Sequence, residues 1–179
     1  MSGADPTGAV RRLTGKLCVL RPLDPDDADP LIEIQAEPSV ARWWYPPDPE
    51  TMRKQVQGRD DSNSVSLGIE RDGQLIGLIQ YEEETDSDFR HAAVDMFLAT
   101  EHQGHGIGPD AMRTLARHLI DDRGHHRLTI DPVLGNTAAI RAYEKVGFRP
   151  VGVMRQYWRG PDGEMHDGLL MDLLAGELK

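Results

Sequence analysis

Apolar and polar residues alternate in several short segments of the chain, which is typical of strands that bury one face. Asp72-Gly73 and Gly160-Pro161-Asp162-Gly163 separate neighbouring segments, and both are turn sequences. The pattern therefore predicts antiparallel hairpins at these turns. The predicted strands cover residues 17–21, 64–70, 74–81, 92–98, 127–130, 151–158 and 166–174.

Elsewhere the apolar residues follow the period of an amphipathic helix. Asp24 and Asp48 are each followed by proline, so they predict the N-caps of two helices. The first helix is expected to end at Pro38 and the second at about Arg59. The clearest helix follows residue 108, where apolar residues recur at i, i+3, i+4, i+7 and i+8, namely Met112, Leu115, Ala116, Leu119 and Ile120.

The order β-α-α-β-β-β-α-β-α-β-β indicates a mixed α+β fold. A chain of 179 residues without an internal linker is expected to form one domain, over residues 17–179. Residues 1–16 are small and polar, without the apolar stretch of a signal peptide, and we expect them to be a flexible leader.

Composition narrows the possible partners. The net charge of −10 argues against nucleic acid and favours a cationic substrate. No apolar run reaches membrane-spanning length, so we expect no membrane partner. The single cysteine, Cys18, excludes an internal disulfide and fits a cytoplasmic protein. The seven histidines lack the spacing of a zinc site, and we predict no metal.

Residues 103–108, Gln-Gly-His-Gly-Ile-Gly, lie between a predicted strand and a predicted helix. Such a turn presents bare backbone N–H groups and the positive end of a helix dipole to an anion. A P-loop is excluded because no Gly-Lys-Ser/Thr follows, and the last glycine gap is wrong for a dinucleotide fingerprint. The turn therefore predicts a site for some other anionic ligand.

A second motif follows at residues 136–148, Asn-x-x-Ala-x-x-x-Tyr-x-x-x-Gly-Phe, with Asn136 as an expected N-cap and Gly147 as a C-cap. Together, Gln-x-x-Gly-x-Gly and this motif resemble the hallmarks of the GCN5-related N-acetyltransferases (GNAT). The resemblance covers nearly the whole chain, from about residue 17 to residue 174. It implies a central, mostly antiparallel twisted sheet of six to seven strands flanked by about four helices, and acetyl-CoA as cosubstrate.

The resemblance also assigns roles to residues. Tyr143 is expected to act as general acid toward the coenzyme thiolate, although an apolar helix face would also explain a tyrosine there. Pro109 removes one N–H group and Asp110 adds a carboxylate beside the expected pyrophosphate, which would weaken or shift binding. The implied coenzyme-binding residues are Phe97, Leu98, Ala99, Gln103, Gly104, His105, Gly106, Ile107, Gly108, Asn136, Ala139, Tyr143 and Lys145.

A narrower resemblance, to the aminoglycoside 6′-N-acetyltransferases, concerns the acceptor. It rests on the acidic block at residues 82–86, on residues 94–98 and 129–132, and on the tryptophan pair. By that resemblance Asp95 accepts the proton of the attacking ammonium group. Independently, Asp95 interrupts an apolar strand, and an apolar site raises the pKa of a carboxyl group. The implied substrate-binding residues are Trp43, Trp44, Glu82, Glu83, Asp86, Asp95 and Asp131.

Other interpretations stay open. The acidic block is also what a solvated hairpin end looks like, and both tryptophans suit an ordinary core. The same scaffold could acetylate a protein N-terminus, a polyamine or a siderophore intermediate. A non-catalytic sensor of acyl-CoA is a further possibility. The sequence leaves open the length of the acyl chain and the choice between a monomer and a homodimer.

Overall fold

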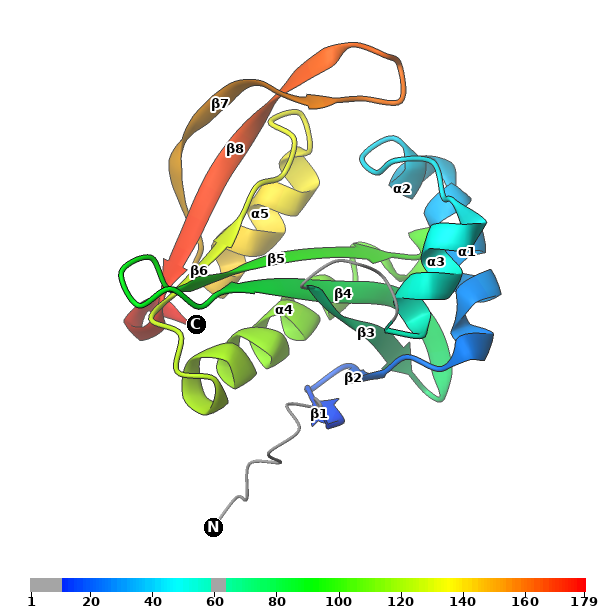
Figure 1. Cartoon of the computed structure of the whole chain (residues 1–179), viewed down its shortest axis with the longest axis horizontal. Coiled ribbons are helices and arrows are strands. Elements are labelled where there is room, and N and C mark those ends of the chain that lie inside the picture. The colour runs from blue at the N-terminus through cyan, green and yellow to red at the C-terminus, as the bar shows by residue number, and fades with distance from the viewer. Residues whose placement is uncertain (1–10, 59–63) are drawn as a thin grey trace.

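The computed structural model describes residues 11–58 and 64–179. Its strands form one sheet in the order β1-β2-β3-β4-β5-β6-β8-β7, in which every neighbouring pair is antiparallel except β5 and β6 (Figure 1). The strands are β1 (Leu13–Thr14), β2 (Val19–Pro22), β3 (Ser64–Arg71), β4 (Gln74–Glu84), β5 (His91–Leu98), β6 (Arg127–Ile130), β7 (Arg149–Arg159) and β8 (Met165–Leu174).

Helices cover both faces of the sheet. The α-helices are α1 (Ala28–Ala36), α2 (Pro38–Ala41), α3 (Pro49–Val56), α4 (Ile107–Arg117) and α5 (Thr137–Val146). Shorter helical turns are η1 (Pro25–Asp27), η2 (Thr100–His102) and η4 (Ala175–Glu177), and a π-helical turn, η3 (His118–Asp122), extends α4. None of the helices in the described ranges is long and apolar enough to cross a membrane.

Two apolar cores lie on opposite faces of the central strands. Helices α4 and α5 pack on one face together with Ile79 and Tyr81 of β4. Helices α1 and α3 pack on the other face with Leu78 of β4 and Phe97 of β5. Because β4 is covered on both sides, its middle is an unbroken run of buried residues, from Ile76 to Ile79.

The predicted α+β class and element order are confirmed, with two additions. Strand β1 was expected to belong to the leader, but Leu13 pairs with Leu20 and packs on the core. Residues 1–10 of that expected leader lie outside the described residues. Pro38 ends α1, as predicted, and it also begins the one-turn helix α2, because proline suits the first position of a helix. Helix α3 ends at Val56, earlier than expected.

The arrangement of β5 and β6 creates an opening in the sheet. These parallel strands pair at two positions only, Ala92 with Leu128 and Ala93 with Thr129. Beyond Ala93 the pairing ends, and β6 continues along β8 while β5 continues along β4. The two strands therefore separate toward their carboxyl ends, which leaves the backbone of the second half of β5 unpaired on that side (Figure 1).

Candidate active site

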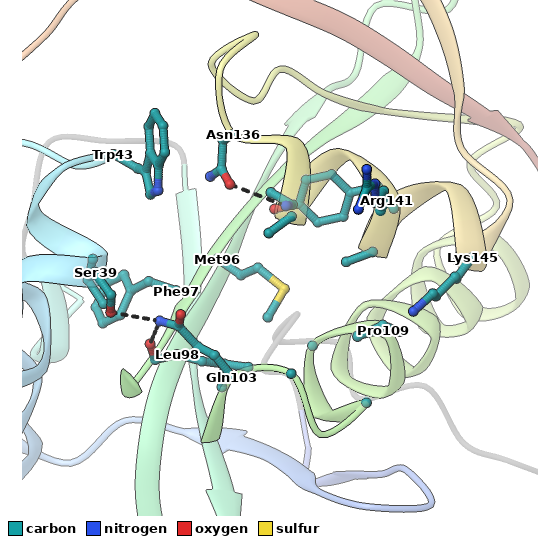
Figure 2. Close-up of a pocket in the computed structure, with 18 of the residues that line it drawn as sticks. Ser39, Trp43, Met96, Phe97, Leu98, Gln103, Pro109, Asn136, Arg141 and Lys145 are labelled. Atoms are coloured by element: carbon teal, nitrogen blue, oxygen red, sulfur yellow. Dashed lines mark hydrogen bonds between the residues drawn. The ribbon is translucent and has the colours of Figure 1, made fainter. Parts of the chain in front are cut away.

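A cleft of about 380 Å³ lies where β5 separates from β6, between the glycine-rich turn and α5. Figure 2 shows residues of β5, α4, α5 and the α2 region converging on it. The predicted residues at this cleft are Trp43, Trp44, Phe97, Leu98, Gln103, Gly104, Gly106, Gly108, Asn136, Ala139, Tyr143 and Lys145. The cleft is also lined by residues outside the predicted sets of binding residues, namely Ser39, Val40, Met96, Pro109, Ala138, Arg141 and Ala142.

The glycine-rich turn has a backbone that demands glycine. Gly104 and Gly106 have φ angles of 79° and 82°, a region that side-chain-bearing residues rarely adopt, and Gly106 is the N-cap of α4. The side-chain amide of Gln103 donates to the Leu98 carbonyl oxygen at 2.9 Å and to Ser39 Oγ at 3.1 Å (Figure 2). Gln103 therefore fixes the turn against the end of β5 and against α2.

Two cationic side chains from α5 face the glycine-rich turn across the cleft. Arg141 and Lys145 both line the cleft, and they lie four residues apart on the same side of the helix (Figure 2). At the start of α5, the Asn136 side chain accepts from the Ala139 N–H at 3.2 Å, as an N-cap should. Arg141 was missed by the sequence analysis, although its spacing from Lys145 was a signal for it.

The carboxylate of Asp110 is turned away from the cleft. It accepts from the backbone N–H groups of Leu17 at 2.7 Å and Lys16 at 3.2 Å, in the loop between β1 and β2, and it is 6% exposed. This geometry corrects the expectation that Asp110 stands beside the anion. Pro109 does line the cleft, as expected from its place in the turn.

Asp95 lies in the unpaired part of β5, opposite Gln80 of β4. One of its carboxylate oxygens accepts from the Met96 N–H at 2.8 Å. Its side chain reaches solvent, yet the surrounding protein removes enough hydration to raise the pKa of the carboxyl group to about 7. The Met96 hydrogen bond lowers this pKa in part, and the charge of Asp131 raises it further.

Tyr143 lines the cleft from α5 and is 7% exposed. Burial, followed by the negative charges of Asp95 and Asp131, raises the pKa of its phenol well above the ordinary value. Tyr143 therefore keeps its proton throughout the neutral range. The ring packs on Phe148 at a centroid distance of 6.1 Å, which fixes the side chain toward the cleft.

Asp131 follows the end of β6 and accepts a hydrogen bond from the hydroxyl of Tyr157, on β7. This hydrogen bond, together with burial, raises the pKa of Tyr157 to about 12. Asp131 was predicted as a substrate-binding residue, whereas Tyr157 was not. No local sequence signal marks Tyr157, because its position depends on an irregularity of β7.

The acidic block is divided between the two faces of β4. Cross-strand partners share a face, so Glu82, two residues from Gln80, lies on the face of Asp95. Glu83 lies on the opposite face, where it binds Arg123 at 2.7 Å and His125 at 2.6 Å. This pairing corrects the expectation that Glu83 holds the substrate, and it follows from the alternation of side chains along a strand.

Asp86 and three predicted coenzyme residues also lie away from the cleft. Asp86 sits in the turn after β4, where its side chain accepts from the Asp88 N–H at 2.9 Å, as in a solvated hairpin end. Ala99 and Ile107 are buried in the two cores, and His105 is exposed on the turn. Their part in a site would be through backbone groups only.

Trp43 and Trp44 have different surroundings. Trp44 packs edge-on against Phe97 at 5.0 Å, and it belongs partly to the core of α1 and α3. Trp43 carries the Arg42 guanidinium over its ring at 4.6 Å and lines the cleft near the loop before α5. Both tryptophans line the cleft, and Trp43 belongs to neither apolar core.

Comparison with known proteins identifies the family. Residues 18–149 match the acetyltransferase (GNAT) domain family, so the chain belongs to the GNAT acetyltransferases, which use acetyl-CoA. Mycobacterium smegmatis RimJ, solved in complex with CoA-disulfide, has a TM-score of 0.79 and 23% identity, over 94% of this chain and 88% of RimJ. The predicted GNAT fold is confirmed, and the described part of the chain has eight strands in place of six to seven.

Two relatives carry names that point to different acceptors. Bacillus subtilis YdaF, which carries a provisional name as a ribosomal N-acetyltransferase, is 28% identical over 166 residues, 87% of each chain. Aminoglycoside N(6′)-acetyltransferase type 1 of Klebsiella pneumoniae is 38% identical over 84 residues. That second match covers 46% of this chain and 39% of the relative's own length. The comparisons therefore identify the family of this protein but not its acceptor.

Proposed function

We propose that this protein transfers the acetyl group of acetyl-CoA to an amine of a polycationic small molecule, most simply the 6′-amino group of an aminoglycoside. The observation that carries the proposal is Asp95. Its carboxylate lies in the unpaired half of β5 with a pKa of about 7, close enough to Asp131 for the two negative charges to interact and close enough to Tyr143 to help keep that phenol protonated. A carboxylate of this kind suits a general base at neutral pH.

The residues at the cleft fit the coenzyme. Gly104, Gly106 and Gly108 leave the backbone of the turn accessible to a diphosphate, and the start of α4 adds the positive end of its dipole. Arg141 and Lys145 supply positive charge from the other side of the cleft. When bound, acetyl-CoA supplies the activated thioester.

Two side chains then handle protons. Asp95 accepts a proton from the substrate ammonium, which frees the amine for direct attack on the thioester carbonyl without an acyl-enzyme. Tyr143 remains protonated at neutral pH, so it can donate a proton to the departing thiolate. Because a thiolate is a tolerable leaving group, Tyr143 assists the reaction, whereas Asp95 is needed for it.

The acceptor side is acidic, which supports a cationic substrate. Asp131 and Glu82 add carboxylates on the side of Asp95, and Trp43 offers a flat ring to a sugar. The net charge of −10 attracts a polycation over longer distances. The 38% identity to an aminoglycoside enzyme supports the same class of acceptor.

A second candidate acceptor is the N-terminal amine of a ribosomal protein. The similarity to YdaF favours it, because that match spans most of both chains. Acetylation of a polyamine or of a siderophore intermediate would use the same base and the same acid. A non-catalytic acyl-CoA sensor would bind coenzyme without needing either.

An acetyl-transfer assay that follows released thiol distinguishes these acceptors. The panel contains kanamycin A, spermidine and a basic peptide with a free N-terminus, with Asp95→Asn as the control for the base. The proposal predicts the highest kcat/KM for kanamycin A. A higher value for the peptide would assign the second candidate, and coenzyme binding without any turnover would assign a sensor.

A further inference from the structure

Strand β7 leaves its regular pairing close to the acceptor side. Met154 pairs with Gly168 of β8 and Trp158 pairs with His166, so three residues of β7 stand opposite Asp167 alone. Within this bulge, Gln156 has a φ angle of +48°. A residue other than glycine in this region carries a conformational cost, and bulges often redirect a side chain near an active site.

The bulge is held in place rather than loosely formed. The Gln156 N–H donates to Asp167 Oδ1 at 2.8 Å. Core packing does not explain the strained backbone, because Gln156 is exposed and the Tyr157 side chain is 51% exposed. The feature that the bulge does provide is the direction of Tyr157.

Tyr157 crosses β8 at the one place where β8 has no side chain. A Cβ atom added to Gly168 would lie 2.8 Å from Cδ1 of the Tyr157 ring, so glycine makes room for the ring. The hydroxyl then reaches Asp131 Oδ2 in the loop after β6. This loop is tied to β8 by backbone hydrogen bonds from Leu134 to Asp167, 2.8 Å, and from Leu169 to Pro132, 2.9 Å.

We infer that Tyr157 is a positioning residue, which holds Asp131 as a binding group for a second ammonium of the acceptor beside Asp95. The inference rests on the proposed function and extends it to the selectivity between amines with one and with several positive charges. The phenol occupies one oxygen of Asp131, and no residue in the described ranges hydrogen-bonds the other oxygen, which can accept from a cation. An amine with a second positive charge therefore gains a partner that a monoamine cannot use.

The test compares wild type with Tyr157→Phe on kanamycin A, which carries several ammonium groups, and on 6-amino-6-deoxyglucose, which carries one. Losing a hydrogen bond to a charged group is expected to raise KM for kanamycin A about tenfold. The KM values for the monoamine sugar and for acetyl-CoA, the kcat and the melting temperature should stay unchanged. Tyr45→Phe is the matched control, because Tyr45 is an exposed tyrosine at 60% whose substitution removes the same hydroxyl elsewhere.

A second variant moves the ring without deleting the hydroxyl. Gly168→Ala forces Tyr157 aside and is expected to reproduce the selective loss for kanamycin A. An equal rise of KM for both amines, or no rise for either, would overturn the inference.

Absence of turnover by wild type would contradict the proposed function but would still leave a test of Tyr157. The same two amines are then compared by isothermal titration calorimetry in the presence of CoA. The inference predicts that Tyr157→Phe raises the Kd for kanamycin A about tenfold and leaves the Kd for the monoamine sugar unchanged. Equal affinity of wild type and variant, or no binding by wild type, would overturn it.

Discussion

At the scale of single residues, one environment raises the pKa values of two acids with opposite consequences. Desolvation brings the pKa of Asp95 to about 7, which makes this carboxylate a base that titrates near neutrality. Desolvation and nearby negative charge keep the Tyr143 phenol protonated, which suits it to give a proton. The base and the acid are therefore distinguished by their chemistry, although both lie at the same opening of the sheet.

Asp95→Asn should lower kcat about 100-fold or more and leave the Kd for CoA unchanged, because the base acts on the amine and not on the coenzyme. In the wild type, kcat/KM should rise with pH and level off above a pH of about 7, as Asp95 becomes ionised. Initial rates and coenzyme titrations measured between pH 5 and 9 check both points. A parallel loss of coenzyme affinity would count against the assigned role.

The same carboxyl group should make stability depend on pH. Its pKa is about 7 in the folded chain, compared with an ordinary value of 3.8, so between these pH values the folded protein binds a proton that the unfolded chain does not. The free energy of unfolding contributed by Asp95 is therefore highest below pH 3.8 and falls as the pH rises through 7. Asparagine does not titrate, so Asp95→Asn should raise the melting temperature relative to wild type more at pH 8 than at pH 5. An identical difference at both pH values would contradict the raised pKa.

At the scale of elements, sequence motifs predicted what is local and missed what depends on pairing between strands. The turn at residues 103–108 and the caps of α5 are set by neighbours in the chain, and they were predicted. Glu82 and Glu83 point to opposite faces because neighbouring residues of a strand alternate, but the predicted strand ended at residue 81, before both of them. The reach of Tyr157 follows from a bulge opposite Asp167, which leaves no pattern in one sequence.

The glycine turn gives a prediction at this scale. Gly106→Val places a branched side chain at a φ of +82° on the N-cap of α4, so the turn must rearrange and the Kd for CoA should rise at least about tenfold. Gly124→Val is the matched control, since Gly124 has a φ of +74° but does not line the cleft. The control should lose stability while keeping coenzyme affinity. Similar coenzyme affinities for the two variants would argue against the turn as the anion site.

A substitution of Asp110 tests whether its carboxylate lies away from the anion site. Asp110→Ala removes the acceptor of two backbone N–H groups in a buried setting, so it should lower the free energy of unfolding by about 2 kcal/mol. Coenzyme affinity should be unchanged, because the carboxylate points to the loop between β1 and β2. Urea unfolding and a coenzyme titration measure the two effects. A large gain in coenzyme affinity would show that Asp110 does oppose the anion.

At the scale of the whole molecule, a net charge of −10 surrounds a cleft that contains its own cations. The overall field repels an anionic coenzyme, so backbone N–H groups together with Arg141 and Lys145 have to hold it locally. The same field draws a cationic acceptor toward the carboxylates beside β5. The order of the elements could be predicted from the sequence. The coenzyme cleft and the acidic acceptor region adjoin each other because β5 separates from β6, and this separation could not be predicted.

The most direct test is a crystal structure of the protein with CoA and kanamycin A. We predict that the diphosphate oxygens accept from N–H groups of residues 104–108 and that the coenzyme sulfur lies between Tyr143 and the amine nearest Asp95. A coenzyme bound elsewhere, or an Asp95 carboxylate separated from the acceptor by the sheet, would contradict the account.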